Sequence, residues 1–367
     1  MKILVCFGTR PEAIKMAPVC IELSKHKISY KICVTAQHRE MLDQVLDFFE
    51  LIPDYDLNLM KAGQNLNDLS SLILKSVDNV FEKEEFDLVL VHGDTTTSTM
   101  VALAAFHRGI KVGHVEAGLR TYNKKAPFPE EINRQLTAKI ADYHFAPTKL
   151  AEKNLLNEGI QKSKIFLTGN TVIDALLFTI KKINNGFTNE TIDKLKKEID
   201  FNKKILLVTG HRRENFGEGI INICNAIIEV SKNQNIEVVF PVHLNPNVKE
   251  TVYSILSNKS NIHLIQPINY PSFVWLMSKS SLILSDSGGI QEEAPTLGKK
   301  VIVTRTISER SEAVKTGFSF LVGCDTSKII ATINSCLKKT ENYSKNKNPF
   351  GSGKASVEIV NNLKILI

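Results

Sequence analysis

Short apolar runs alternate with amphipathic segments along almost the whole chain. The first run, Lys2–Phe7, precedes a helical pattern from Glu12 to Lys25, and the next, Tyr30–Val34, precedes a helical pattern from His38 to Phe49. Further runs follow in the same alternation at Asp87–Val91, Lys111–Val115, Tyr143–Ala146 and Ile165–Leu167. Strands that alternate with helices form parallel sheets, because each helix carries the chain back to the starting edge. Residues 1–169 are therefore predicted to form a doubly wound α/β domain.

A polar stretch, Asn184–Lys203, separates this block from a second block of the same kind. The apolar runs of the second block are Lys204–Thr209, Glu237–Pro241, Leu282–Leu284 and Phe320–Val322. A chain of 367 residues is long enough for two separate cores. We therefore predict an α/β fold of two doubly wound Rossmann-like domains facing a cleft, with the second domain at residues 170–352.

Acidic residues follow two neighbouring strands of the first predicted domain. Asp94 comes just after one apolar run, and Glu116 comes directly after the next. The carboxyl ends of strands carry the ligand site in an open parallel sheet, so both acids are expected at one edge. Asp94 alone would also suit a cap for a helix from Thr95, and Glu130 and Glu131 would suit the start of a helix through its dipole. Acids that recur after neighbouring strands favour a chemical role for Asp94 and Glu116.

In the second predicted domain, a glycine turn joins the strand Leu282–Leu284 to a helical pattern that begins at Ile290. The turn consists of Ser285, Asp286, Ser287, Gly288 and Gly289. Glycines let the backbone approach a ligand closely, and the N–H groups of a helix start suit a phosphate. Glu292 and Glu293 follow one turn later and suit sugar hydroxyls. The alternative is an ordinary strand-to-helix turn followed by two solvated glutamates.

Positive charge gathers elsewhere in the second domain, where His211, Arg212 and Arg213 follow the strand that begins the block. This contrast with the acids of the first domain fits a substrate that has an anionic leaving part. The arginines would also suit simple pairing with surface acids, which is common and weak. His243 fits an ordinary loop histidine, and Phe273 either stacks on a base or belongs to the core.

Composition excludes several other classes of protein. The chain has 46 basic and 39 acidic residues, but its lysines are spread out and form no basic block with interleaved aromatics, so nucleic-acid binding is not predicted. The six cysteines form no close pairs, which argues against a zinc knuckle or a redox dithiol. No apolar run is long enough for a signal peptide or a membrane span, so a cytoplasmic protein is expected. Neither G-x-G-x-x-G nor a P-loop occurs, so a redox dinucleotide and ATP hydrolysis are not predicted.

Ten strings spread in order over nearly the whole chain resemble the non-hydrolysing UDP-N-acetylglucosamine 2-epimerases of bacteria. They are GTRPEAIKMAP from Gly8, TAQHREMLDQVL from Thr35, HGDTTT from His92, HVEAGLRT from His114, PFPEEINR from Pro127, GNTVIDAL from Gly169, HRREN from His211, PVHLNPNV from Pro241, DSGGIQEEAP from Asp286 and ERSEAV from Glu309. The resemblance implies a fold like that of the GT-B glycosyltransferases and a homodimer. It also implies that a last helix, at about residues 353–367, packs back onto the first domain.

The activity that the resemblance implies is the interconversion of UDP-GlcNAc and UDP-ManNAc, with neither a cofactor nor a metal. Asp94, Glu116 and Glu130 match the acid/base carboxylates of the family, and His211 matches its catalytic histidine near the diphosphate. The positions that match UDP contacts are Arg10, Lys15, Phe273, Ser287, Gly288, Gly289, Glu293 and Arg310, with Glu293 on the ribose and Phe273 near uracil.

The family resemblance also implies an allosteric site for a second UDP-GlcNAc. The matching positions are Gln37, His38, Gln64, Arg212 and His243. The chain departs from the family at Gly63, where some members have arginine, at Ile268, where some have glutamine, and at Ser311, where many have proline.

The chemistry of this reaction explains why carboxylates and cationic residues are needed. The proton on C2 of the sugar has no adjacent carbonyl, so direct abstraction is unfavourable. Expulsion of UDP from C1 acidifies that proton and yields 2-acetamidoglucal, for which carboxylates and a cationic diphosphate site are needed. The alternatives are a hydrolysing or 6-deoxy-sugar 2-epimerase, a retaining GT-B glycosyltransferase and a regulator that binds nucleotide sugars without turnover.

Overall fold

The computed structural model describes residues 2–36, 39–60, 63–306, 310–338 and 348–366. The chain divides into two compact units, of which the first comprises Met1–Leu177 together with Phe350–Ile367 and the second comprises Phe178–Pro349. The division falls inside one continuous helix, α7 (Thr171–Asn184), whereas the predicted boundary at residue 169 lies just before that helix.

The first unit is a seven-stranded sheet in the order β3-β2-β1-β4-β5-β6-β7, and all of its strand pairs are parallel. Its strands are β1 (Lys2–Phe7), β2 (Ser29–Val34), β3 (Tyr55–Asp56), β4 (Leu88–His92), β5 (Lys111–Val115), β6 (Tyr143–Ala146) and β7 (Ile165–Leu167). Its helices are α1 (Arg10–Lys25), α2 (Arg39–Phe49), α3 (Leu66–Lys83), α4 (Thr96–His107), α5 (Glu130–Ile140), α6 (Lys149–Asn157) and α15 (Ala355–Leu366).

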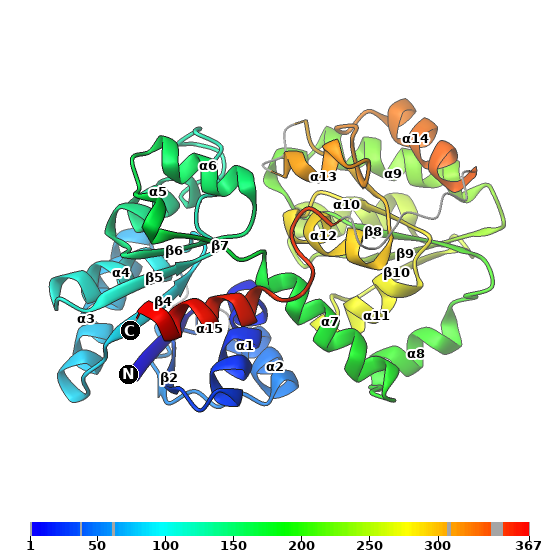
Figure 1. Ribbon diagram of the computed structural model, residues 1–367. Coiled ribbons are helices and arrows are strands. Elements are labelled where there is room, and N and C mark those ends of the chain that lie inside the picture. The colour runs from blue at the N-terminus through cyan, green and yellow to red at the C-terminus, as the bar shows by residue number, and fades with distance from the viewer. Residues whose placement is uncertain (1, 37–38, 61–62, 307–309, 339–347, 367) are drawn as a thin grey trace. The chain divides into compact units, whose positions relative to one another are not determined.

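Helices cover both faces of this sheet. On one face α1 packs against α2 and α15, and on the other α4 packs against α3 and α5. Figure 1 shows α15, from the C-terminal end of the chain, lying along α1 from its N-terminal end. The start of α15 is held by Asp174 in α7, whose carboxylate accepts hydrogen bonds from the backbone N–H groups of Ala355 and Ser356.

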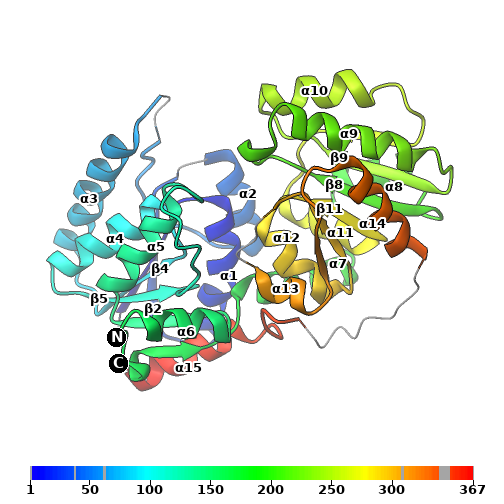
Figure 2. The ribbon, with the colours of Figure 1, turned by 90° about the horizontal axis from the view of Figure 1, so that it is seen from above.

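The second unit is a six-stranded sheet in the order β10-β9-β8-β11-β12-β13, again with parallel pairs throughout. Its strands are β8 (Lys204–Thr209), β9 (Ile236–Pro241), β10 (Ile262–Ile265), β11 (Leu282–Ser285), β12 (Val301–Val303) and β13 (Ser319–Leu321). Its helices are α8 (Glu190–Glu198), α9 (Glu218–Ser231), α10 (Pro246–Leu256), α11 (Tyr270–Lys279), α12 (Gly288–Glu293), α13 (Ser311–Lys315) and α14 (Thr326–Lys338). Figure 2 shows α9 and α10 side by side, where α9 packs against both α10 and α14.

The strand order reverses direction once in each sheet, between β1 and β4 in the first unit and between β8 and β11 in the second. This confirms the prediction of two doubly wound Rossmann-like domains. Ligands bind outside the carboxyl ends of the strands at such a reversal. The turns after β1, β4 and β5, and those after β8 and β11, are therefore where functional residues are expected.

Candidate active site

The turn after β1 is built around a buried glutamate. Thr9 is the N-cap of α1, and Glu12 completes a capping box by accepting hydrogen bonds from the N–H groups of Gly8 (3.0 Å) and Thr9 (2.8 Å). The other carboxylate oxygen of Glu12 accepts from the hydroxyls of Thr95 (2.7 Å) and Ser98 (3.0 Å). Burial raises the pKa of Glu12, although these hydrogen bonds oppose the shift. One side chain thus ties the turn that carries Arg10 to the turn after β4.

Glu116, directly after β5, meets a buried cation. The ammonium group of Lys15 on α1 forms an ion pair with Oε2 of Glu116, and the two side chains are only 10% and 8% exposed. Asn170 donates to the same oxygen from Nδ2 at 2.9 Å. The ring of His92 lies nearby, with Nε2 3.8 Å from Oε2, and burial lowers the pKa of His92 to about 4. Lys15, which the family resemblance assigns to UDP, therefore contacts a candidate acid.

Asp94, after β4, does not cap the following helix. Thr95 is the N-cap of α4, so the alternative that Asp94 fills this role is wrong. The carboxylate of Asp94 instead accepts a hydrogen bond from the guanidinium of Arg134, which lies on α5 and is buried. Asp94 and Glu116 occupy the same edge of the sheet, since a Cβ added to Gly93 would lie 3.6 Å from Oε1 of Glu116.

The two glutamates that begin α5 have different surroundings. Glu131 is fully buried and accepts hydrogen bonds from the backbone N–H groups of Thr121 and Tyr122, both at 3.0 Å, so it shapes the preceding loop. Glu130 is half-buried, and its Oε2 has no hydrogen-bond partner among the residues that the structure describes. Glu130 is therefore the one of the pair whose carboxylate has an oxygen, itself buried, that the described residues leave without a hydrogen bond.

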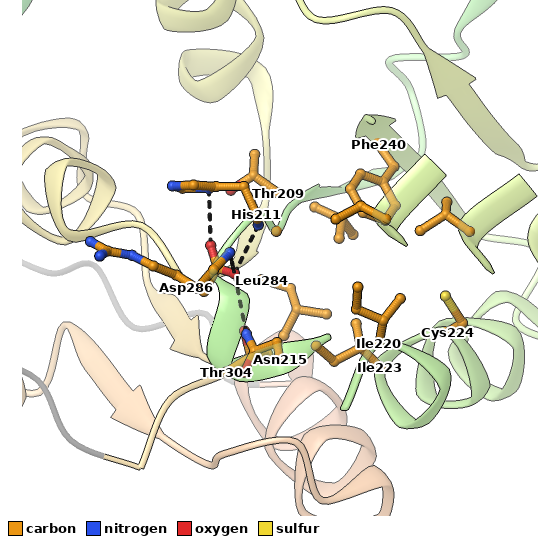
Figure 3. Close-up of a pocket in the computed structure, with 15 residues that line it drawn as sticks. Thr209, His211, Asn215, Ile220, Ile223, Cys224, Phe240, Leu284, Asp286 and Thr304 are labelled. Carbon is orange, nitrogen blue, oxygen red and sulfur yellow. Dashed lines mark hydrogen bonds and ion pairs between the residues drawn. The ribbon is translucent and has the colours of Figure 1, made fainter. Parts of the chain in front are cut away.

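In the second unit the turns after β8 and β11 meet at a buried aspartate (Figure 3). Oδ2 of Asp286 accepts hydrogen bonds from the backbone N–H groups of His211 and Arg212, both at 2.9 Å, and from Nδ2 of Asn215 at 3.2 Å. Oδ1 lies 3.2 Å from Nδ1 of the exposed His211 ring. Burial alone would raise the pKa of Asp286, but the bonds from His211 and Arg212 outweigh it and leave the pKa below its ordinary value. Asp286 thus fixes the backbone of the loop and places a carboxylate oxygen beside the ring of His211.

The two arginines of this loop, Arg212 and Arg213, are not paired with acids in the described part of the chain. Neither Arg212 nor Arg213 forms an ion pair within the described ranges of the chain, and Nε of Arg212 is buried without a hydrogen-bond partner there. The alternative that both arginines simply pair with surface acids is therefore not what the described residues show. The ring of His243 stacks on that of His211, with centroids 5.8 Å apart.

The glycine turn Ser287–Gly289 leads into α12, which has only 6 residues. The guanidinium of Arg310 lies against Gly288, where an added Cβ would be 2.6 Å from Cζ. Arg310 is itself held by Glu292, whose Oε1 accepts from Nη2 at 2.9 Å and from Nε at 3.0 Å. The alternative of two solvated glutamates is wrong, because the side chain of Glu292 is 1% exposed and Glu293 is also buried. Since α12 is so short, Arg310 is the stronger source of positive charge at this turn.

Glu293 and Phe273 are related through helix α11 of the second unit. Glu293 is buried, and its Oε1 accepts a hydrogen bond of 2.7 Å from the hydroxyl of Tyr270 at the start of α11. Phe273, on the same helix as Tyr270, is half-buried rather than part of the core. A partly exposed ring on the helix whose first residue binds a buried carboxylate is compatible with a base and a ribose.

The residues assigned to a second site are only partly described. Gln37 and His38 lie outside the described residues. Gln64 is half-buried just before α3, and Arg212 and His243 lie in the loops described above. In the described part of the chain, no group of three or more His, Cys, Asp or Glu side chains has an arrangement that would hold a metal ion. No helix in that part is both long and apolar enough to cross a bilayer.

Sequence reasoning missed the residues that hold the candidate acids and the candidate histidine. Arg134, Asn170 and Asp286 all lie inside the strings PFPEEINR, GNTVIDAL and DSGGIQEEAP, but no role was predicted for them. Arg134 follows Glu130 by one helical turn, which puts it on the same face of α5. That spacing was the one signal available before the structure.

The chain is similar to known proteins over its whole length. The profile of the UDP-N-acetylglucosamine 2-epimerase family matches residues 21–364. A UDP-N-acetylglucosamine 2-epimerase of Neisseria meningitidis is 52% identical over 368 residues, which cover 99% of each chain. The crystal structure of UDP-GlcNAc 2-epimerase from Neisseria meningitidis bound to UDP-GlcNAc matches with a TM-score of 0.94, at 51% identity and 100% coverage of both chains. A second crystal structure matches with a TM-score of 0.87, at 37% identity and 100% coverage of both chains. It is that of the Methanocaldococcus jannaschii UDP-GlcNAc 2-epimerase in complex with UDP-GlcNAc and UDP.

These similarities confirm the predicted family resemblance and the GT-B-like fold. They extend across both units, including the turns after β4, β5, β8 and β11 that carry the candidate residues. With a profile that matches most of the chain and relatives that match all of it, the chain belongs to the UDP-N-acetylglucosamine 2-epimerase family of isomerases.

Proposed function

We propose that this protein interconverts UDP-GlcNAc and UDP-ManNAc by eliminating UDP from C1 together with the C2 proton, and then adding UDP back to C1 while a proton is delivered to the opposite face of C2. The observation that carries the proposal is the pair of carboxylates after neighbouring strands, Asp94 and Glu116, each bound to a cation that is itself buried, Arg134 and Lys15. A protein that only bound an anionic nucleotide sugar would have little use for these acids. The structure of the Neisseria meningitidis relative bound to UDP-GlcNAc supports the substrate.

In the elimination step, the C1–O bond to UDP breaks and its electron pair leaves with the diphosphate. The proton on C2 then passes to a carboxylate, and a C1–C2 double bond forms, which gives 2-acetamidoglucal. Positive charge that develops at C1 is stabilised by nearby carboxylates, and the proton transfer is general base catalysis. Asp94, Glu116 and Glu130 are the groups we propose for these roles.

In the re-addition step, a proton is delivered to C2 from the opposite face and the UDP oxygen attacks C1. Atoms and electrons balance over the two steps, so neither an oxidant nor a reductant is consumed. Inversion requires proton transfer at both faces of C2, which either two carboxylates or a rotation of the glycal provides. Glu130, whose buried Oε2 has no partner among the described residues, is our candidate for the second face.

The leaving diphosphate needs positive charge and N–H donors, which the second unit supplies. We propose that Arg310, the Ser287–Gly289 turn and His211 bind it, with His211 held by Asp286. Arg10, at the start of α1, is a further candidate from the first unit. The ribose then meets Glu293 and the base meets Phe273. Charge-assisted hydrogen bonds of this kind stabilise the departing oxygen more in the transition state than in the substrate.

We also propose that UDP-GlcNAc regulates the enzyme from a second position. The support is Arg212, whose buried Nε has no partner among the described residues, and the exposed His243, whose ring stacks on that of the neighbouring His211 in the second unit. The Methanocaldococcus jannaschii relative, in complex with both UDP-GlcNAc and UDP, supports two nucleotide positions.

The deciding experiment is turnover of UDP-GlcNAc in heavy water with no cofactor added. We expect UDP-ManNAc that carries deuterium at C2, detected by mass spectrometry and by loss of the C2 proton signal. Product that keeps its original hydrogen would contradict elimination. Free ManNAc with UDP would instead identify a hydrolysing enzyme, and no epimer at all would favour a glycosyltransferase or a binding protein.

A further inference from the structure

Asn170 lies at the junction where the chain leaves the first unit and returns to it. It immediately precedes α7, and its backbone N–H donates to the carbonyl of Phe350 at 2.8 Å. Gly169 and Gly351 lie in van der Waals range of each other there, since a Cβ on Gly169 would be 3.5 Å from Cα of Gly351. Asn170 is 2% exposed, so its side-chain polar groups must be paired within the protein.

The orientation of the Asn170 amide follows from its partners. The side-chain oxygen Oδ1 accepts a hydrogen bond of 3.0 Å from the backbone N–H of Val172 and so caps α7. A backbone N–H can only donate, which fixes Oδ1 on that side and leaves Nδ2 on the other. Nδ2 therefore donates to Oε2 of Glu116 at 2.9 Å, and this bond cannot be reversed by flipping the amide.

Glu116 needs such support because its own backbone is in an unfavourable conformation. Its φ is 62°, a left-handed value that is unfavourable for a non-glycine residue and that persists only where surrounding contacts enforce it. Lys15 and Asn170 reach the same oxygen, Oε2, from two different elements. Together they fix both the position and the rotation of the carboxylate.

We propose that Asn170 is a further positioning residue of the epimerase reaction, which holds the Glu116 carboxylate in one orientation through its side-chain amide. This inference rests on the proposed function. A helix cap alone does not require asparagine, since serine, threonine and aspartate cap as well. Only asparagine offers an acceptor to the helix and a donor to Glu116 at the same length, whereas aspartate would place a second negative charge against it.

Asn170→Asp tests the proposal, because it keeps the size and the capping oxygen but replaces the donor with an acceptor. We expect kcat to fall about tenfold to a hundredfold, while the Kd for UDP stays within about twofold of wild type, since only a buried bond to Glu116 is lost. In this variant the introduced carboxylate faces that of Glu116, and at lower pH the two share one proton. The shared proton restores a hydrogen bond between position 170 and Glu116. The ratio of variant to wild-type kcat should therefore rise as the pH falls from about 8 to about 6.

Asn202→Asp is the matched control. Nδ2 of Asn202 also donates to a carboxylate, that of Asp200 at 3.1 Å, but in an exposed turn away from the candidate site, so its kcat should not change. Should Asn170→Asp fail to fold, Asn170→Ser keeps a capping oxygen and lacks the reach to Glu116. Its kcat should also fall, with UDP binding retained.

Wild-type kcat in both Asn170 variants would overturn the proposal, and so would a loss of kcat in Asn170→Asp whose size is the same at every pH. The latter would indicate a structural role only. Wild-type protein that does not epimerise in the same assay would contradict the proposed function itself. Active wild type beside fully active variants would contradict this inference alone.

Discussion

Arg134 donates a hydrogen bond from Nη2 to Oδ2 of Asp94, from a side chain that is only 5% exposed. Its Nη1 lies 3.6 Å from Glu131, and neither Nη1 nor Nε has a hydrogen-bond partner in the described part of the chain. The buried positive charge thus lies between Asp94 and Glu131, and through the bond to Asp94 the helix α5 fixes the turn after β4.

Replacing Arg134 with lysine keeps the charge but removes the planar group that meets the carboxylate. We expect Arg134→Lys to lower kcat about tenfold, because a point charge on a shorter stem leaves the Asp94 carboxylate less well oriented. The Kd for UDP should not change, and calorimetry on the same preparation checks this.

Arg120→Lys is the control for the loss of a buried arginine. Arg120 makes a two-pronged contact with Glu158, from Nε at 2.7 Å and from Nη2 at 2.8 Å, on the side of α6. This variant should lower thermal stability without lowering kcat. Equal kcat losses in the two variants would mean that Arg134 acts only through stability.

The fold was predictable because its signal is local, whereas the site residues that were missed depend on contacts distant in sequence. Most strands are short apolar runs and most helices have an amphipathic pattern, so both signals lie within the element itself. The bond from Arg134 to Asp94 spans 40 residues and that from Asn170 to Glu116 spans 54, and no local pattern encodes such pairs. The polar stretch before β8 was predicted only as a separator, yet it contains α8, which buries Ile192 and Leu195 against α11. Two apolar side chains among many lysines gave too weak a periodic signal.

Glu293→Ala should weaken binding of UDP by about 1–3 kcal/mol, because ribose hydroxyls would lose a buried acceptor. The contact between Glu293 and the Tyr270 hydroxyl adds a second route by which this variant disturbs the site. Tyr270→Phe removes that hydroxyl and keeps the ring, so it isolates the second route. Calorimetry should show a much smaller loss for Tyr270→Phe.

Asp94→Asn provides the opposite behaviour for comparison. It should keep UDP affinity and lower kcat by roughly a hundredfold or more, as expected for loss of an acid/base group. If Glu293→Ala lost turnover at unchanged UDP affinity while Asp94→Asn lost UDP, both assignments would have to be exchanged.

Stability should fall as the pH is lowered, because buried histidines remain neutral in the folded protein. Burial, reinforced by the charges of Lys164 and Arg120, lowers the pKa of His144 to about 4, and neither of its ring nitrogens has a partner among the described residues. Burial also lowers the pKa of His92 to about 4 and that of His114 to about 3. Below the ordinary pKa of about 6.5 the unfolded chain binds protons that the folded one does not, so stability is lost as pH falls from about 6.5 towards about 4.

His144→Leu removes one of these protonations. Each such histidine contributes up to about 1.4 kcal/mol of unfolding free energy per pH unit, so urea unfolding between about pH 6.5 and about pH 4.5 should show a shallower slope by roughly 1 kcal/mol per unit. His107→Leu, at an exposed position on α4, is the control and should leave the slope unchanged. An unaltered slope in His144→Leu would show that this ring is already protonated in the folded protein.

The rings of His211 and His243 are stacked, with their planes inclined by 24°. A test of regulation that replaces His243 therefore also affects His211. We expect UDP-ManNAc alone to be converted slowly and a trace of UDP-GlcNAc to accelerate it, because a ligand favours the state to which it binds more tightly. His243→Ala should diminish this acceleration. Since the same change removes a neighbour of His211 and can lower kcat by itself, the informative quantity is the ratio of initial rates with and without the trace of UDP-GlcNAc. A ratio near one for the wild type, with no lag in its progress curves, would rule out the second position and leave the epimerase proposal intact.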